Sequence, residues 1–323
     1  MKRGLVSWDH NELPLEELGT RLAAAHAIAR SKGVDAVVVY SDVWRSNDAR
    51  YLSNYMPYWN RAFVVVPRDD KPVLLCSLSP RVYPWIKTVT THETIIASPS
   101  PPATLFKLST ERGWKKLGIC DLEGLPADLH AELTSGKLEL VDIPRSEIRP
   151  VPTEAEVRMH ARAARMAREV LEQEISSAVG QIDHELTGRL ERLLRRAGAE
   201  DVVVLVCDGR GPPVPAFGAV VGPHTSVVLA IEYNGHWAKV TRNVAGLISN
   251  LPARAAAVTE LREILSGPYS WENIDDAATP AVISLQHEIH FQNQRLYYGD
   301  TCLQGQEGLR VLAVLEGLHH FGD

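Results

Sequence analysis

The first half of the chain alternates helical and strand patterns of hydrophobic positions. Residues 15–31 place leucine, isoleucine and alanine three and four positions apart, as on one face of a helix, and Gly33 follows where a helix C-cap is expected. Runs of β-branched and other apolar residues that predict strands follow at 34–40, 61–67, 72–76, 116–120 and 138–141. A helical segment at 127–133 separates the last two strands. This alternation predicts an α/β domain.

A segment with two prolines, residues 146–153, is the predicted linker between two domains. We therefore expect an N-terminal domain at 1–148 and a C-terminal domain at 149–323. The length of 323 residues agrees with this division, because single domains seldom grow so large.

The second half begins with helices and ends with strands. Thr153 and Glu156 fit a capping box that opens a long helix, and a second amphipathic helix at 183–197 follows. Strand patterns then appear at 202–206, 226–233, 238–245 and 309–315, with a helical pattern at 252–265 between the last two. This order predicts an α+β domain with an antiparallel sheet.

Composition narrows the possible functions. The formal net charge is −6, so no basic excess is available to neutralise phosphates, and a dedicated nucleic-acid binder is excluded. No apolar run approaches the roughly 18–20 residues that span a bilayer, and the N-terminus lacks the apolar segment of a signal peptide. The four cysteines are scattered without a CxxC pair, which is typical of reduced, buried thiols. We expect a cytoplasmic protein that binds neither nucleic acid nor membrane.

Five short motifs follow one another along the chain. They are RYLSNY at 50–55, GQIDHELTGRLERLLRRAGA at 180–199, YNGHWAKVTR at 233–242, HE at 287–288, and the segment 299–317. In this order they resemble the creatinase/prolidase/aminopeptidase P family, and the resemblance covers almost the whole chain. It implies an α/β creatinase-like N-terminal domain followed by a C-terminal domain with the α+β pita-bread fold.

The same resemblance shows that metal ligands have been replaced. Metal-dependent members of the family hold two divalent cations with two aspartates, one histidine and two glutamates. An alignment without gaps over residues 222–242 places Val228 and Lys239 at the two aspartates, and Pro280 falls at the histidine. A divalent pair needs several anionic oxygens to offset about four positive charges. A lysine ammonium at roughly 4 Å would instead cost about 4 kcal/mol per unit of like charge, at an effective dielectric near 20.

The two glutamate positions differ from each other. Gln304 or Gly305 falls at the first, and Glu307 would serve there only after a two-residue slip, whereas Glu316 matches the second. We therefore expect neither a dinuclear metal centre nor any other cofactor. Creatinase is a metal-free member of this family, so the resemblance still allows catalysis without these ligands.

Lys239 is the central candidate residue. In a strand it shares a face with Trp237 and Thr241, and the resemblance implies that this face lines the pocket. Lys239 would replace the metals electrostatically, pair with Glu316, and hold a substrate carboxylate or stabilise a developing anion. A desolvated lysine would alternatively act as a base or an amine nucleophile. The structural alternative is an ordinary solvated lysine on a strand.

Three further residues complete the predicted catalytic group and its surroundings. Glu316 is a general acid and base or merely the counter-ion of Lys239. His287 is the proton carrier and, by resemblance, a hydrogen-bond partner of the substrate, with Glu288 beside it as a binding residue. The alternative for His287 is a histidine on a surface loop. A mononuclear metal site of His287, His290 and Glu316 has weak support, because its histidines lack the i,i+4 spacing of HExxH.

An aromatic loop in the first domain is the second candidate region. Tyr55, Tyr58 and Trp59 lie in a short proline-containing segment that ends at Arg61. In the family that the chain resembles, the N-terminal domain of one subunit overhangs the active site of its dimer mate. The resemblance therefore implies a homodimer in which these four residues cover a small ligand in the partner's pocket. Burial at the dimer contact is the alternative.

Two hypotheses for the function follow. The first is a metal-independent enzyme with a biosynthetic role. It acts near a C–N bond of a small amino-acid-like or amidine-like molecule, by hydrolysis, elimination or rearrangement. The second is a catalytically inactive homologue that binds a ligand or a partner protein. An enzyme requires Lys239, Glu316 and His287 to converge in one pocket, with at least one perturbed pKa.

Overall fold

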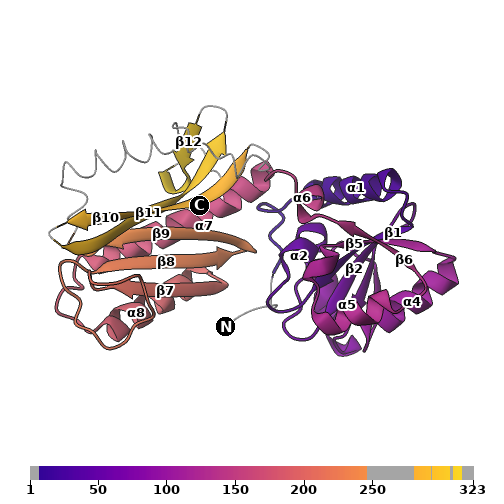
Figure 1. Cartoon of the computed structure of the whole chain (residues 1–323), viewed down its shortest axis with the longest axis horizontal. Coiled ribbons are helices and arrows are strands. Elements are labelled where there is room, and N and C mark those ends of the chain that lie inside the picture. The colour runs from indigo at the N-terminus through magenta and orange to yellow at the C-terminus, as the bar shows by residue number, and fades with distance from the viewer. Residues whose placement is uncertain (1–6, 246–279, 292, 306–307, 315–323) are drawn as a thin grey trace. The chain divides into compact units, whose positions relative to one another are not determined.

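The chain divides into two units, residues 1–150 and 151–323 (Figure 1). The structure, a computed structural model, describes residues 7–245, 280–291, 293–305 and 308–314. No helix among these residues is both long enough and apolar enough to cross a membrane.

The N-terminal unit is built on a mixed six-stranded sheet with the order β4-β3-β2-β1-β5-β6. Strand β2 is antiparallel to β1 and β3, and the other neighbours are parallel. Its strands are β1 (Ala36–Ser41), β2 (Ala62–Pro67), β3 (Val73–Cys76), β4 (Thr94–Ala97), β5 (Lys116–Cys120) and β6 (Glu139–Ile143). Its α-helices are α1 (Leu15–Ser31), α2 (Asn47–Ser53), α3 (Tyr83–Val89), α4 (Pro101–Arg112), α5 (Ala127–Thr134) and α6 (Arg145–Ile148), with single turns η1 (Pro80–Val82) and η2 (Leu122–Gly124).

Both faces of this sheet are buried, which explains the continuous apolar runs of its central strands. Val37 and Val39 of β1 pack in one hydrophobic cluster with α1 and α2, whereas Val38 packs in a second cluster with α4 and α5. Successive side chains of a strand point to opposite faces, so an unbroken run of valines supplies both cores.

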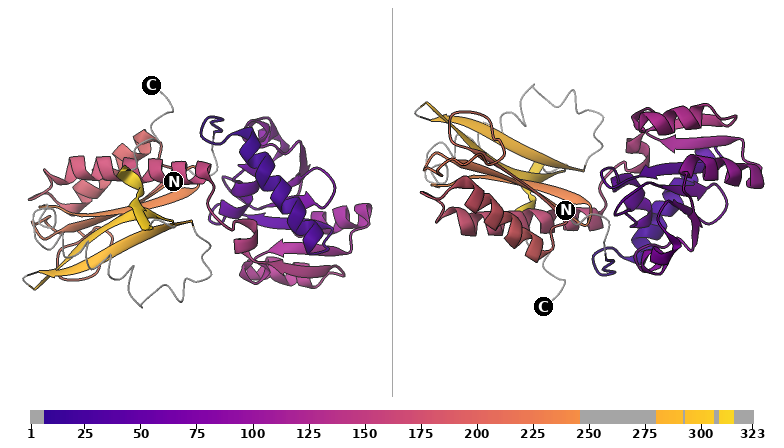
Figure 2. Two further views of the ribbon diagram at one scale, coloured as in Figure 1. Left: turned by 90° about the horizontal axis from the view of Figure 1, so that it is seen from above. Right: turned by 90° about the horizontal axis from the view of Figure 1, so that it is seen from below.

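The C-terminal unit places two long helices against one face of a second sheet. Its helices are α7 (Glu154–Ile175) and α8 (Asp183–Ala197). Its strands are β7 (Asp201–Cys207), β8 (Ser226–Tyr233), β9 (His236–Asn243), β10 (Ala281–Phe291), β11 (Gln294–Gly305) and β12 (Gly308–Val311), followed by the single turn η3 (Leu312–Val314). The strand order is β10-β11-β9-β8-β7, neighbouring strands of the described residues are antiparallel, and β12 pairs with β11. The views in Figure 2 show both helices on the same side of this sheet.

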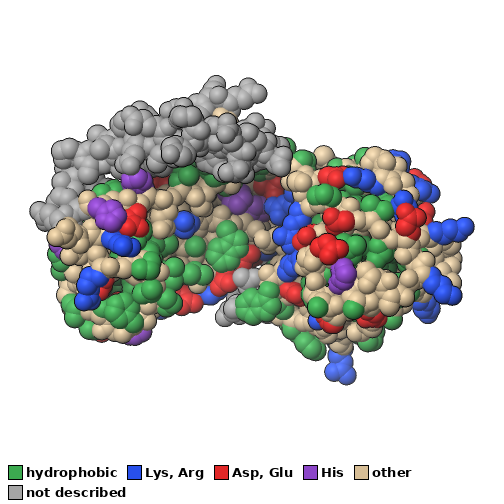
Figure 3. Space-filling view, in the orientation of Figure 1, with side chains coloured by type: hydrophobic (Ala, Val, Ile, Leu, Met, Phe, Trp, Pro, Cys, Tyr) green, Lys and Arg blue, Asp and Glu red, His purple; other side chains and the backbone are tan. Residues whose placement is uncertain are grey.

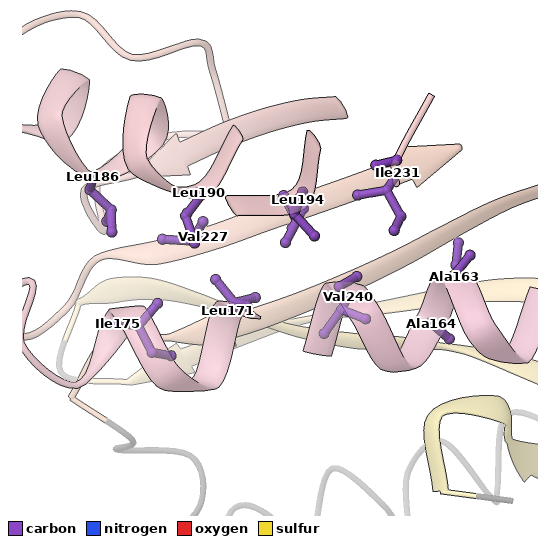
Figure 4. Close-up of a cluster of buried hydrophobic side chains, with 14 of the residues drawn as sticks. Ala163, Ala164, Leu171, Ile175, Leu186, Leu190, Leu194, Val227, Ile231 and Val240 are labelled. Atoms are coloured by element: carbon purple, nitrogen blue, oxygen red, sulfur yellow. The ribbon is translucent and has the colours of Figure 1, made fainter. Parts of the chain in front are cut away.

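Leucine and alanine spacing fixes the two helices on the sheet. Leu186, Leu190 and Leu194 recur every four residues on α8 and point toward β8 (Figure 4). The alanines at 163–164 of α7 let that helix approach β9 closely. Burial of each leucine contributes about 1.5–3 kcal/mol relative to an exposed position.

The helix boundaries follow the predicted local signals. Thr153 Oγ1 accepts a hydrogen bond from the Glu156 backbone N–H, and the Glu156 carboxylate accepts one from the Thr153 backbone N–H. At the end of α8, Gly198 has a φ of 108°, a conformation that favours glycine over residues with a side chain.

The sheet of the C-terminal unit therefore has two unlike faces. Val240 of β9 and Val227 of β8 belong to the core under α7 and α8. Their strand neighbours, such as Lys239 and Val228, point to the opposite face. We call this opposite side the distal face.

The predicted two-part fold is confirmed, with local corrections. The final predicted strand, 309–315, is shorter in the structure, because β12 ends at Val311 and η3 follows it. The helical pattern at 252–265 lies outside the described residues. Strand β10 is not among the predicted elements, because its segment is too polar to show a strand pattern of apolar residues.

Candidate functional site

Side chains from four strands form three transverse rows on the distal face. The strand registers define the rows as Ala230, Lys239, Thr301 and Ser284; then Val228, Thr241, Gly299 and Gln286; then Ser226, Asn243, Tyr297 and Glu288. Figure 3 shows hydrophobic side chains gathered over β7 and β8, and charged and histidine side chains over the β10 end of the sheet. The face is thus apolar on one side and polar on the other.

Lys239 lies at the boundary between the apolar and polar parts. Its side chain is half-buried, and burial lowers the pKa of its ammonium group below the usual 10.5. No carboxylate of the described residues lies within 4 Å of this ammonium group. A cation that is partly desolvated without a nearby carboxylate favours an anionic ligand.

Thr301 fixes the strand that carries Lys239. The Lys239 backbone N–H donates to Thr301 Oγ1 at 2.8 Å, and the Thr301 hydroxyl donates to the Lys239 carbonyl oxygen at 3.0 Å. Thr301 is only 1% exposed, so this side chain takes the place of a backbone partner inside the sheet. Ser284 Oγ lies 3.2 Å from Thr301 Oγ1, on the side away from Lys239.

A glycine allows two polar side chains to meet across β11. Thr241 Oγ1 donates to Gln286 Oε1 at 3.3 Å, and Gly299 lies between them in the same row. A Cβ atom on Gly299 would lie 2.3 Å from the Leu285 carbonyl oxygen. Any larger residue would push β10 away from β11, so Gly299 is needed for the contact between Thr241 and Gln286.

Glu288 is held in a small polar network in the third row. Its Oε2 accepts a hydrogen bond from the Tyr297 hydroxyl at 2.9 Å. Its Oε1 lies 3.1 Å from His290 Nε2 and 3.5 Å from Arg295 Nε. Glu288 is exposed and lies on the distal face, as a binding residue for a ligand near Lys239 requires.

His287 lies on the other face of the sheet. It pairs with Tyr298, whose ring lies 4.6 Å from the guanidinium carbon of Arg242. Arg242 is bonded to Asp300 at 2.9 Å and to Glu172 of α7 at 3.1 Å, which places this group on the helix side. The expectation that His287 converges with Lys239 is therefore wrong, because neighbouring residues of a strand point in opposite directions.

Two of the predicted site residues remain to be placed. Trp237 is half-buried on the distal face, two residues from Lys239, and its carbonyl oxygen lies 2.8 Å from His160 Nδ1. Glu316 lies outside the described residues, as does Glu307, so its predicted pairing with Lys239 stays a prediction.

The aromatic loop of the N-terminal unit is only partly exposed. Tyr55 is fully buried, with its hydroxyl 3.3 Å from Cys76 Sγ and its ring 6.5 Å from Trp85, so it is a core residue and cannot contact a ligand. This corrects its prediction as a binding residue. Tyr58 is half-buried and packs edge-on against Trp85, whereas Trp59 is exposed.

Arg61 is engaged within its own unit. Its guanidinium group bonds to the Asp128 carboxylate at 2.5 Å, and this hydrogen bond raises the pKa of Arg61. Asp128 is 61% exposed and Arg61 is 36% exposed, so solvent screens the pair and it stabilises the fold only slightly. Contact of Arg61, Tyr58 or Trp59 with a ligand stays a prediction.

A hollow outside the three rows lies at the connection between β7 and β8. It has a volume of about 520 Å³ and is lined by residues that include Asp208, Arg210, Phe217 and His224. Asp208 and Arg210 form an ion pair with each other, with Arg210 Nε 2.8 Å from Asp208 Oδ2. The charges of this pair therefore offset each other within the hollow.

The described residues do not fit a pair of divalent cations. At the two aligned aspartate positions the distal face carries the buried Val228 and the ammonium group of Lys239. Pro280, at the aligned histidine position, is exposed and has no ligating atom in its side chain. Across the part of the chain that the structure describes, no group of three or more histidine, cysteine, aspartate and glutamate residues could hold a metal ion.

Three polar residues of the distal face escaped the sequence analysis. Ser284, Gln286 and Thr301 carry no motif, and the contacts with β9 span 45 residues for Gln286 and 62 for Thr301. A signal did exist in β10, because Ser284, Gln286 and Glu288 alternate with the half-buried residues between them.

Comparison with known proteins identifies solved structures that have a similar fold. No protein-family profile matches the sequence, and no curated protein matches it. Solved structures match over nearly the whole chain. An X-Pro aminopeptidase from Thermotoga maritima has a TM-score of 0.71 at 16% identity, covering 91% of this chain and 97% of that chain. An Xaa-Pro dipeptidase from Bacillus anthracis has a TM-score of 0.69 at 15% identity, covering 92% and 98%.

A prolidase from Pyrococcus horikoshii is similar to the same degree, with a TM-score of 0.69 at 16% identity over 92% of this chain and 99% of that chain. Identities at this level establish the fold and leave the chemistry to be argued from the residues. The chain therefore has the two-part pita-bread fold of the creatinase, prolidase and aminopeptidase P structures.

Proposed function

We propose that the distal face binds a small amino-acid-like or amidine-like molecule through Lys239, and that the protein acts near a C–N bond of that molecule without two metal ions. The observation that carries the proposal is the half-buried ammonium group of Lys239, on the face where the aligned aspartates of metal-dependent proteins would lie. A fixed cation there attracts a carboxylate and repels divalent ions.

Two observations support a reaction near a C–N bond. The similar solved structures are those of a dipeptidase, a prolidase and an aminopeptidase, enzymes that act on a peptide C–N bond. Lys239 can neutralise negative charge that develops during attack on a carbonyl or amidine carbon. Because His287 lies on the other face, we assign no proton transfer to it at this position.

The position of His287 also favours a second candidate function, a catalytically inactive homologue that only binds its ligand. Loss of one predicted proton carrier leaves Glu316, and Lys239 in its alternative role as a base, as the candidates for proton transfer. Binding without turnover would support this second function. Turnover that requires Lys239 would support the first.

Titration calorimetry against free amino acids, dipeptides and guanidino carboxylates tests the proposal. We expect Lys239→Ala to weaken binding of any bound carboxylate at least tenfold, since a charge-assisted hydrogen bond is lost. Lys239→Arg should retain most of the affinity because it retains the charge. Arg310→Ala removes an exposed cation from the edge strand β12 and serves as the control for net charge. Unchanged binding by Lys239→Ala would refute the proposal.

Ammonia and amine release from the same compounds measures C–N bond cleavage separately. We expect release by the wild-type protein and none by Lys239→Ala. Tight binding with no release from any compound would exclude the enzymatic part and leave the ligand-binding part intact. The homodimer expected from the resemblance remains a proposal that sedimentation analysis would test.

A further inference from the structure

The hydroxyl groups of the first row form a hydrogen-bonded chain whose direction is fixed. A threonine hydroxyl has one proton to donate and two lone pairs. Thr301 donates its proton to the Lys239 carbonyl oxygen and accepts the Lys239 backbone N–H on one lone pair. In the 3.2 Å contact between Thr301 and Ser284, only Ser284 can therefore be the donor.

This assignment determines what Ser284 can offer to a ligand. Its only proton is used on Thr301, so its outward side presents lone pairs alone. Ser284 is exposed, whereas Thr301 beneath it is buried. Donation along the chain also polarises the oxygen of Ser284 and strengthens it as an acceptor. A ligand must bring an N–H group to it, and a carbonyl or carboxylate oxygen at the same place would be repelled.

The two sides of the row thus have opposite preferences. Lys239 on β9 offers positive charge, and Ser284 on β10 offers an acceptor, two strand spacings or about 10 Å away at the backbone. Glu288, four residues along β10 on the same face, adds a carboxylate that is partly offset by Arg295. A molecule with an anionic group at one end and an N–H group at the other matches this separation of charge.

We infer that Ser284 is a specificity-determining residue that accepts a hydrogen bond from an N–H group of the ligand, while Lys239 holds the ligand's anionic group and Thr301 fixes the proton direction. The inference rests on the proposed function, which places the ligand on the distal face, and it orients the ligand there. The N–H belongs to an ammonium or an amide group. A carboxylate with an oxo group in place of its amine is the molecule that this arrangement rejects.

Matched pairs of probes test the inference by calorimetry, namely 4-aminopentanoate against 4-oxopentanoate and 5-aminohexanoate against 5-oxohexanoate, whose two polar groups lie several carbon atoms apart. We expect the wild-type protein to bind the amino member at least about tenfold more tightly, since a hydrogen bond to a charged group is gained and an acceptor clash is avoided. Ser284→Ala should bring this ratio close to one with little effect on folding, because the side chain is exposed. Thr301→Ser keeps the hydroxyl chain and should keep the ratio.

Thr301→Val gives an independent readout, because it frees the proton of Ser284 and lets that residue donate. We expect this variant to lower the ratio of amino to oxo affinity below that of the wild type, a ratio that any shift of Lys239 common to both members leaves unaffected. A ratio unchanged by Ser284→Ala, with binding still dependent on Lys239, would overturn this inference and leave the proposed function standing. Absence of binding by every probe in the wild-type protein would overturn both.

Discussion

Thr301 and Lys239 are joined by two hydrogen bonds, in which one side chain serves both backbone groups of its neighbour. The arrangement ties β11 to β9 at the row that carries the candidate cation. It also makes the position of Lys239 depend on a hydroxyl that lies 62 residues further along the chain.

Removal of that hydroxyl should be costly. Thr301→Val leaves the buried N–H and C=O of Lys239 without their partner, and we expect the free energy of unfolding to fall by about 3 kcal/mol. Thr301→Ser loses only a methyl group and should cost about 1 kcal/mol. Urea unfolding followed by circular dichroism compares the two variants. Equal losses would mean that the hydroxyl contributes nothing.

The pair of Arg242 and Asp300 behind the distal face gives a second prediction. Asp300 is 6% exposed and bonds to Arg242 at 2.9 Å, whereas the other carboxylate partner, Glu172, is 43% exposed. We expect Asp300→Ala to lower the free energy of unfolding by about 3 kcal/mol, because it leaves a buried guanidinium group poorly compensated. Glu172→Ala should cost under about 1 kcal/mol. A larger effect for Glu172 would contradict this order.

The pH dependence of ligand binding reports on Lys239. Burial lowers the pKa of its ammonium group below 10.5, so the desolvation penalty acts on the folded protein at neutral pH and is relieved as the pH rises toward 10.5. A bound anion favours the charged form and raises this pKa again. We therefore expect carboxylate affinity to fall as the pH rises through the lowered pKa of Lys239, before a free lysine would titrate.

Lys239→Arg is the matched control for this titration, because arginine stays protonated throughout the range. Calorimetry from pH 7 to about pH 10.5 should show constant affinity for the arginine variant and declining affinity for the wild type. A parallel decline in both proteins would show that another group is responsible.

A gain of metal binding tests why the distal face differs from that of metal-dependent structures. Val228 and Lys239 lie diagonally on neighbouring strands, so Val228→Asp combined with Lys239→Asp places two carboxylates on one face. We expect Mn²⁺ to raise the thermal unfolding temperature of this double variant and to leave the wild type unchanged. Lys239→Ala controls for loss of the positive charge alone. Stabilisation of the wild type by Mn²⁺ would contradict the account.

The sequence contained enough information for the fold and only part of the site. The capping box of Thr153 and Glu156 and the leucine spacing of α8 are local signals, and they predicted the helices correctly. Lys239 was found because it interrupts a recognisable motif. The role of His287 came from the resemblance alone, and its position in β10, on the opposite face from Glu288, becomes visible only once the segment is known to be a strand.

Contacts of long range explain the residues that were missed. Thr301 and Ser284 become significant only through the register of β9, β11 and β10, which depends on tertiary pairing and not on local pattern. Tyr55 shows the reverse case, since its place in an aromatic loop suggested exposure, but packing against Trp85 buries it completely. Polarity alone does not distinguish a binding loop from a folded core segment.

Metal content of the untagged wild-type protein tests the central claim, that the cation of Lys239 stands where other proteins of this fold use metal ions. Mass spectrometry before and after incubation with manganese, zinc, cobalt and iron, followed by dialysis, would count the ions per chain. The account predicts that no ion is retained in stoichiometric amount. One or two tightly held ions per chain would contradict it and move the search for ligands to His287, His290, Glu307 and Glu316.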